Sequence, residues 1–213
     1  MNQEFVQTLF YGNVGLAPEE FTGLAVRYSD PAATNGSHVL DAGGAGSDNS
    51  SIWLVGWGDD SLCGIFPKGS KAGLVHEDLG LQTIEVAGGV GGSKMRAYQD
   101  HFQWKCGIAL KDWRFVVRIG SIDISNLVTK TNAADLVELM IKAQHRMPNM
   151  NAGKKFVYYM NRSVFQMLDI QRRDAVIAGG GLIYKDVDGM SVPHFRNIPI
   201  KVIDQLTELE SLV

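Results

Sequence analysis

The spacing of apolar residues along the chain predicts three helices. Apolar side chains recur three or four positions apart over residues 1–10, 133–147 and 163–169, which places them on one face of a helix. Asn132 caps the second of these segments, and Pro148 ends it. The first segment begins inside its own helical pattern, so we expect the sequence to lack a preceding N-terminal part.

Alternating or continuous apolar runs predict the strands. Two long alternating arms, 102–110 and 113–119, are expected to pair with each other as one β-ribbon. Residues 29–51 contain several glycines, Pro31 and few apolar runs, and are expected to form a long loop. Shorter apolar runs predict strands at 52–57, 62–66, 156–160, 176–184 and 198–203, with a hairpin turn at 58–60 and another turn at 188–189. This order is typical of an α+β protein rather than of repeated βαβ units.

Composition narrows the class of protein. Hydrophobic residues make up 45% and charged residues 20% of the chain, which is typical of a soluble globular protein. The net charge of −3 argues against a dedicated nucleic-acid binder, and no apolar run approaches the roughly 20 residues of a membrane span. Cys63 and Cys106 lie far apart in apolar runs, so we expect free, buried thiols and a reducing compartment.

The glycine-rich segments do not predict a nucleotide site. Residues 64–71 (GIFPKGSK) have the glycine spacing of a phosphate-binding loop, but Ser70 comes before Lys71. The phosphate-binding loop needs the reverse order, because lysine reaches the phosphates and the hydroxyl next to it binds magnesium. The clusters at 43–46 and 88–92 precede no helical pattern and are predicted to be turns or loops.

Metal and nucleophile motifs are also incomplete. His76-Glu77 begins like a zinc-protease motif, but Gly80 occupies the place of the second histidine. Neither cysteine has a partner at ligand spacing, and no G-x-S-x-G motif is present. We therefore expect no cofactor, no metal and no catalytic residue. An enzyme remains an alternative only through a constellation that the sequence does not reveal.

Basic residues are concentrated in the middle of the chain, whereas the charged residues of the first fifty positions are almost all acidic. This zoning is typical of complementary contacts between copies of one protein, although a mixed, solvated surface explains it equally well. The candidate subunit-contact residues are Lys68, Lys71, Arg96, Arg114 and Arg118.

Short motifs are spread along the chain, in a resemblance that covers essentially all 213 residues, and none of them is a catalytic signature. The motifs are 10–13 (FYGN), 18–24 (PEEFTGL), 41–44 (DAGG), 47–49 (SDN), 51–53 (SIW), 64–74 (GIFPKGSKAGL), 101–104 (HFQW), 114–119 (RFVVRI) and 195–200 (FRNIPI). Together they resemble the major capsid proteins of tailed bacteriophages and prophages, in the epsilon15-like group.

The resemblance implies the Hong Kong 97-type capsid fold, which has a peripheral and an axial domain. Residues 1–130, with the β-ribbon, are expected to be mainly peripheral, and residues 131–195 mainly axial. Residues 196–213 are expected to form the final strand and to return to the peripheral region. Relative to the family, the N-terminal arm, the extended loop and most of the spine helix are expected to be missing.

The resemblance also implies a function. The chain is expected to be a structural subunit, not an enzyme, that self-associates into the shell enclosing double-stranded DNA. Expected partners are further copies of itself, scaffolding or portal proteins, and packaged DNA bound non-specifically, but no membrane. The expected locations are the virion and, before assembly, the bacterial host cytoplasm. A hidden enzyme and a host protein-interaction module are the alternatives.

Overall fold

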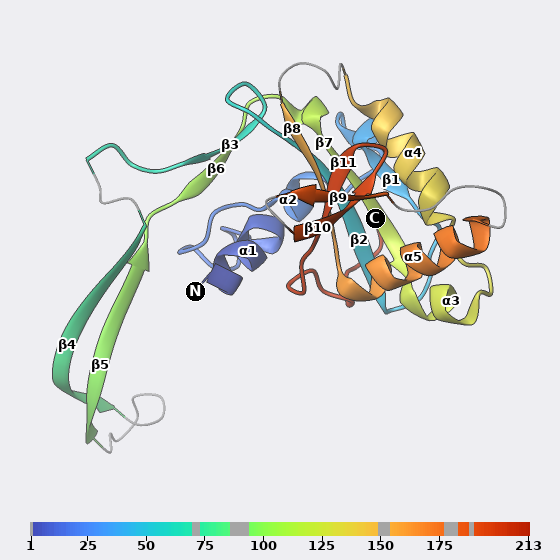
Figure 1. Ribbon diagram of the computed structural model, residues 1–213. Helices are drawn as coiled ribbons and strands as arrows, with labels where there is room; N and C mark the ends of the chain where they lie inside the picture. The colour runs from blue at the N-terminus through green and yellow to red at the C-terminus, as the bar shows by residue number, and fades with distance from the viewer. Residues whose placement is uncertain (1, 70–72, 86–93, 149–153, 177–182, 188–189) are drawn as a thin grey trace. The chain divides into compact units, whose positions relative to one another are not determined.

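The computed structural model describes residues 2–69, 73–85, 94–148, 154–176, 183–187 and 190–213. The chain forms two compact units (Figure 1). The first, which we call the sheet unit, comprises Met1–Cys63 and Ile108–Val213. The second, which we call the hairpin unit, comprises Gly64–Gly107.

The sheet unit contains all the helices among the described residues. They are α1 (Asn2–Tyr11), α2 (Leu24–Arg27), α3 (Ile124–Thr129), α4 (Leu136–Arg146) and α5 (Arg162–Val176), with the 3-10 helices η1 (Gly36–His38) and η2 (Trp113–Phe115). The strands are β1 (Val39–Asp41), β2 (Asn49–Trp57), β7 (Val116–Asp123), β8 (Lys155–Met160), β9 (Ile183–Val187), β10 (Met190–Phe195) and β11 (Ile198–Val202). The chain passes between the units through β3 (Leu62–Ile65) and β6 (Gly107–Leu110).

The strands of the sheet unit form one mixed sheet in the order β1-β7-β2-β8-β11-β10-β9, and β3 joins it beside β2. Strand β2 is antiparallel to both β7 and β8, whereas β1 runs parallel to β7 and β11 parallel to β8. Every residue of β7, and every residue of β2 except Trp57, is buried. Both faces of the central sheet are therefore covered, which explains why the sequence of β2 shows a continuous rather than an alternating apolar run.

Two hydrophobic cores lie on opposite faces of this sheet. On one face, Ile52 and Leu54 of β2 pack with residues of α3, α4 and α5, which lie together on that side (Figure 1). On the other face, Trp53 and Val55 pack with residues of α1, α2 and the C-terminal segment 203–213. The sheet unit is thus a three-layer structure in which α1 contributes one outer layer.

A buried ion pair joins the C-terminal segment to the second face of the sheet. Arg118 of β7 contacts Glu210 (Nη2–Oε2 2.8 Å), and the two side chains are only 5% and 3% exposed. The same guanidinium donates to the hydroxyl of Ser51 (3.1 Å) and to the carbonyl oxygen of Tyr28 (2.8 Å). Each of the three guanidinium nitrogens therefore has a hydrogen-bond partner inside the protein, as burial of a charge requires.

Aromatic side chains complete the surroundings of this ion pair. The Arg118 guanidinium lies 5.3 Å from the centre of the Trp53 ring, and the Tyr11 hydroxyl donates to Glu210. Burial and the Glu210 carboxylate raise the pKa of Tyr11, so its hydroxyl stays protonated and remains a donor. Tyr11 also accepts from the Thr207 backbone (3.1 Å). One cluster therefore holds α1, β2, β7 and the C-terminal segment together.

The helix predictions are largely confirmed. Helix α1 extends to Tyr11, α4 begins at Leu136, and α5 extends well beyond the predicted end at 169. The N-cap of α4 is Asp135, whose carboxylate accepts from the Glu138 backbone, and not Asn132 as predicted. Asn132 has a positive φ of 51°, which is incompatible with the N-cap role.

The predicted pairing of the strands is wrong in two places. The arms 102–110 and 113–119 do not pair with each other: β7 pairs with β1 and β2, and the preceding arm is divided between β5 (Lys94–Trp104) and β6. The expected hairpin across 58–60 is also absent, because the antiparallel partners of β2 are β7 and β8. Alternation shows which residues form strands but not which strand is the partner.

Other strand predictions have mixed outcomes. The segment 29–51 is not one long loop, since it contains η1, β1 and the start of β2. Strands β8 and β11 confirm the predictions at 156–160 and 198–203. The predicted strand at 176–184 is wrong at its start, which belongs to α5, and residues 177–182 lie outside the described residues, as does the predicted turn at 188–189. Strand β10 was not predicted.

Replacing Arg118 by methionine should destabilise the protein strongly. The substitution leaves Glu210 buried without its cation, which typically costs about 3–5 kcal/mol of unfolding free energy. Urea unfolding followed by circular dichroism measures the loss. Arg162→Met is the matched control, because Arg162 forms an ion pair with Asp204 in which both side chains are exposed, and it should have little effect. Equal losses in the two variants would contradict the role given to the buried pair.

Acidification should destabilise the protein in part through His38. This ring is 6% exposed, it packs edge-on against Trp113 at 4.9 Å, and its burial lowers its pKa below the ordinary value. The native state therefore keeps His38 neutral, while the unfolded chain takes up a proton as the pH falls below about 6.5, which favours unfolding. His38→Phe should reduce the loss of stability between pH 7 and pH 5, measured by urea unfolding. Substitution of the exposed His145 should leave that loss unchanged.

Candidate subunit-contact surface

The hairpin unit consists mainly of a two-stranded antiparallel sheet formed by β4 (Leu74–Glu85) and β5 (Lys94–Trp104). The register runs from Leu74 opposite Trp104 to Glu85 opposite Lys94. At about 3.3 Å per residue, each strand spans roughly 35–40 Å. Neither strand has a second neighbour among the described residues, so both backbone edges and both faces of this sheet are open.

A β-bulge fixes the register of the hairpin. Between the pairs Asp78–Asp100 and Leu81–Tyr98, β4 contains two residues where β5 contains one. Gly80 adopts a positive φ of 65° in the bulge, and its N–H donates to the Asp78 carboxylate at 2.8 Å. A glycine is required there because other residues reach this backbone conformation only with strain.

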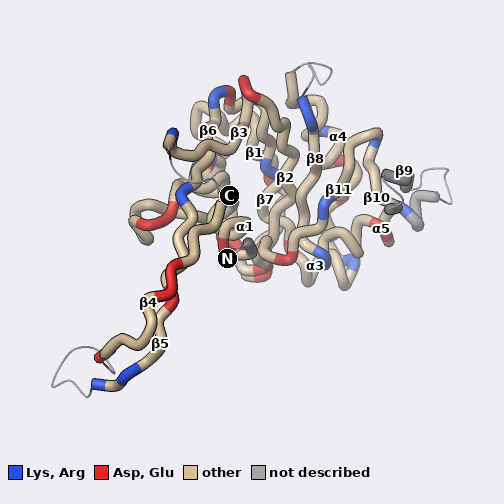
Figure 2. The backbone as a smooth tube through the Cα atoms, turned by 60° about the vertical axis from the view of Figure 1, so that its left-hand side comes forward, with Lys and Arg blue, Asp and Glu red and all other residues tan. Residues whose placement is uncertain are grey.

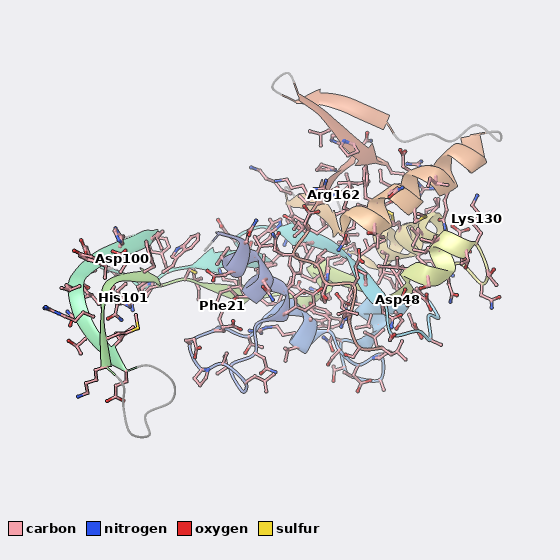
Figure 3. The ribbon with its side chains drawn as sticks, turned by 90° about the horizontal axis from the view of Figure 1, so that it is seen from below. Phe21, Asp48, Asp100, His101, Lys130 and Arg162 are labelled. Atoms are coloured by element: carbon pink, nitrogen blue, oxygen red, sulfur yellow. The ribbon has the colours of Figure 1, made fainter. Side chains whose placement is uncertain are left out.

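The register divides the side chains between two faces, because directly opposite residues share a face and successive residues alternate. The first, which we call the aromatic face, is made of Leu74, His76, Asp78, Leu81, Thr83 and Glu85 with Lys94, Arg96, Tyr98, Asp100, Phe102 and Trp104. The second, which we call the glutamine face, includes Val75, Glu77, Gln82 and Ile84 with Met95, Ala97, Gln99, His101 and Gln103. Asp100 and His101, labelled in Figure 3, are neighbours on opposite faces.

The hairpin exposes far more apolar side chain than a two-stranded sheet can bury by itself. Eight large apolar residues of β4 and β5 are at least one-third exposed, namely Leu74, Val75, Leu79, Leu81, Ile84, Met95, Tyr98 and Phe102. Tyr98 is 84% exposed. An isolated two-stranded sheet is marginally stable in water, and a large exposed apolar patch is typical of an interaction surface. The hairpin is therefore the best candidate for a contact surface.

Charges on the aromatic face are arranged in zones. Asp78 lies directly opposite Asp100, and Arg96 and Lys94 lie further toward the turn on β5. Figure 2 shows this order as acidic positions in the middle of the hairpin and basic positions near the end of β5. His76 stacks on the ring of Phe102 (4.6 Å) and contacts the Asp100 carboxylate through Nε2 (3.0 Å).

The predicted contact residues have different surroundings. Lys68 and Arg96 are exposed in the hairpin unit, and Lys71 lies outside the described residues. Arg114 is exposed in the sheet unit and forms an ion pair with Asp112 (2.8 Å). Arg118 is corrected: its side chain is 5% exposed and bonded to Glu210, so it does not lie on the surface of the chain. Tyr98 and the facing carboxylates were not predicted from the sequence, because the signal that reveals them is the pairing of β4 with β5.

The segment that resembles a phosphate-binding loop is not followed by a helix among the next described residues. The GIFPKGSK segment begins in β3, and the next described element after it is β4 rather than a helix, which does not match a phosphate-binding loop. Among the residues that the structure describes, no group of three His, Cys, Asp or Glu side chains could hold a metal ion. In the same part of the chain, no helix is long and apolar enough to cross a membrane.

A shallow hollow of about 350 Å³ lies at the base of the hairpin, lined by Ile65, Phe66, Pro67, Lys105, Cys106 and Gly107. The lining is mostly apolar, and it offers no carboxylate or imidazole that could act as a base toward the Cys106 thiol. Cys63 and Cys106 are both free, as predicted, but each is partly exposed, so the prediction that they are buried is wrong.

The Cys106 thiol should react slowly with alkylating reagents. Partial burial raises its pKa, so a smaller fraction is thiolate at pH 8 than in an unperturbed thiol, and the thiolate is the reactive form. Iodoacetamide labelling of a Cys63→Ser variant, followed by mass spectrometry, measures the rate. Labelling should accelerate when the protein is denatured in urea. A native rate equal to the denatured rate would show that Cys106 is not shielded.

Comparisons with known proteins place the chain in a family. The family model for the major capsid protein GP7 matches residues 1–213. One similar solved structure is a chain of bacteriophage epsilon15, derived from cryo-EM and modeling, with a TM-score of 0.60 and 29% sequence identity. The match covers 100% of this chain and 63% of that chain. No curated protein sequence matches. Because the family model spans every residue, the chain belongs to the family of the major capsid protein GP7.

Proposed function

We propose that the chain acts as a structural subunit of a bacteriophage or prophage capsid, self-associating through repeated contacts into the shell that encloses double-stranded DNA. The observation that carries this proposal is the match of the GP7 family model to all 213 residues. The similarity to a chain of bacteriophage epsilon15 supports it, although the chain spans only 63% of the length of that relative.

The open hairpin is the part of the structure that best fits such a role. A shell is held together by many weak contacts repeated by symmetry, and each subunit must therefore present surface that is covered only in the assembly. The eight partly exposed apolar side chains of β4 and β5 are surface of that kind. Among the candidate contact residues, Lys68 and Arg96 remain available in this unit, and Arg114 in the sheet unit.

The same comparison supports a proposal about the fold. The mixed α/β structure is similar to that of the epsilon15 chain, and we propose that it has the Hong Kong 97-type capsid fold. The hairpin unit then belongs to the peripheral region, and residues 131–195 of the sheet unit to the axial region. The predicted boundary at 130/131 falls inside the sheet unit, where β2 pairs with both β7 and β8, so the two regions share one sheet.

A role as a capsid subunit also implies where the protein is found and what it contacts. The proposed location is the virion and, before assembly, the cytoplasm of the bacterial host. The proposed partners are other copies, scaffolding or portal proteins, and packaged DNA. With a net charge of −3, the chain has no overall electrostatic attraction for DNA, so a contact with packaged DNA would be local and non-specific.

Expression of the gene, together with any coding sequence that continues its reading frame, should yield closed particles. Negative-stain electron microscopy and light scattering of the purified product test this. The enzyme alternative predicts a ligand instead, and a ligand that binds only the native state raises the melting temperature. Magnesium-ATP and zinc should leave the melting temperature unchanged. A monomer that forms no particles and is stabilised by several degrees by such a ligand would overturn the proposed function.

A further inference from the structure

The aromatic face of the hairpin exposes apolar and charged side chains in a defined order. Tyr98 is 84% exposed, Phe102 49% and Leu81 44%. The rows formed by directly opposite residues, read from the base toward the turn, are His76/Phe102, Asp78/Asp100, Leu81/Tyr98, Thr83/Arg96 and Glu85/Lys94. The middle row is apolar, and it is flanked by a doubly acidic row on one side and a basic row on the other.

Within the described part of the hairpin, neither Asp78 nor Asp100 pairs with a lysine or arginine, and the basic group beside them is His76, whose Nε2 lies 3.0 Å from the Asp100 carboxylate. Like charges directly opposite each other on a sheet are destabilising. Asp78 accepts from the Gly80 backbone, and Asp100 contacts His76, but Arg96 lies four residues from Asp100 along the same strand. That spacing corresponds to about 13 Å, beyond the reach of a direct ion pair within one strand.

A second copy can bring an arginine to this row. Two such faces can be stacked with their strands antiparallel by a twofold rotation about an axis that passes through the Leu81/Tyr98 row. The rotation places each strand over its own copy and exchanges the rows on either side of the axis. Arg96 then faces Asp100 of the second copy, and Thr83 faces Asp78 of the second copy.

The outer rows match as well. The same rotation places Lys94 over the Phe102 ring of the second copy, where an ammonium group is attracted by the aromatic face. It places Glu85 over His76 of the second copy. Every row therefore meets a complementary row, and Tyr98 and Leu81 meet their own copies in the apolar centre.

Among the antiparallel registers in which each strand lies over its own copy, only this one gives Asp100 a cation without a like-charge contact. Moving the axis to the Asp78/Asp100 row brings Asp100 against Asp100 of the second copy, and moving it to the Thr83/Arg96 row brings Arg96 against Arg96. Each intermediate position either brings Glu85 against Asp78 or leaves both carboxylates without a cation. Like-charge contacts of this kind exclude the wrong alignments.

We propose that two copies of this chain associate through the aromatic faces of their β4–β5 hairpins, stacked antiparallel about a twofold axis at Tyr98. The proposal deepens the proposed function, on which it rests, by naming the surface and the partner of one subunit contact. Stacked sheets lie about 10 Å apart, a distance that arginine and aspartate side chains bridge together. Because the ion pairs lie near solvent, the association should weaken as the salt concentration rises.

Charge exchange tests the pairing. Asp100→Arg and Arg96→Asp each place like charges at both symmetry-related contacts, and each should weaken dimerisation of the full chain roughly tenfold. The double variant exchanges the two charges and should restore dimerisation to within about threefold. It should not pair with the unmodified chain, because every mixed contact joins like charges. Sedimentation velocity over a concentration series measures each constant, and Gln99→Arg, on the glutamine face, is the matched control.

A crosslink tests the position of the axis. In a background with Cys63 and Cys106 changed to serine, Tyr98→Cys should form a covalent dimer with a bifunctional maleimide that spans about 8–10 Å, since the two copies of this residue face each other across sheets roughly 10 Å apart. Gln99→Cys, on the opposite face, should not. Circular dichroism of each variant confirms that the sheet unit is folded.

The outcomes separate this inference from the proposed function. Absence of the Tyr98→Cys crosslink, or dimerisation that is indifferent to both charge reversals, would overturn the stacked pairing. Pairing through the open strand edges or through the sheet unit would give that second result. Particle formation by the Asp100→Arg and Arg96→Asp variants at unmodified yield would also overturn it, while the role as a capsid subunit would stand. Absence of particles from the unmodified gene would count against the role itself.

Discussion

The buried contact between Arg118 and Glu210 is the interaction on which the sheet unit depends. It fixes the C-terminal segment on one face of the sheet, and through Tyr11 it also fixes α1. A lone guanidinium at this depth would be costly, but here it is bonded to Glu210, Ser51 and the Tyr28 carbonyl. Elements from both ends of the chain are thereby held to the two most deeply buried strands, β2 and β7.

In its described part, the hairpin unit in contrast leaves its strand edges unpaired and its apolar side chains exposed. Its two strands satisfy each other along one edge only, and their apolar side chains remain open to water. A strand with an unpaired edge can form hydrogen bonds with a strand of any other chain, and charged side chains on the strand reduce such non-specific pairing. On β4 and β5 the charges fall between apolar rows, with Asp78 and Asp100 on one side of Tyr98 and Arg96 on the other. Such an order opposes random association and favours one alignment.

The sequence revealed local structure better than pairing. Amphipathic spacing located α1, α4 and α5, because that signal lies within a single turn of helix. The alternation at 102–119 was genuine, yet its two arms belong to different units, since the partner of β5 is the distant β4. Arg118 was taken for a surface residue because β7 reads as alternating, and only the covering segment with Glu210 shows that both faces are buried. The facing carboxylates could not be predicted without the register.

The two units differ in the source of their stability, which is contacts within the chain for the sheet unit and is expected to be contacts with a partner for the hairpin unit. The sheet unit has two cores and a satisfied buried ion pair, so its stability depends on contacts within one chain. The hairpin contributes little apolar burial, so its stability is expected to depend on what covers it. Binding to the ordered form of a marginal element stabilises that element by mass action. We therefore expect the sheet unit to be stable without a partner, and the hairpin to gain stability when a second copy covers its aromatic face.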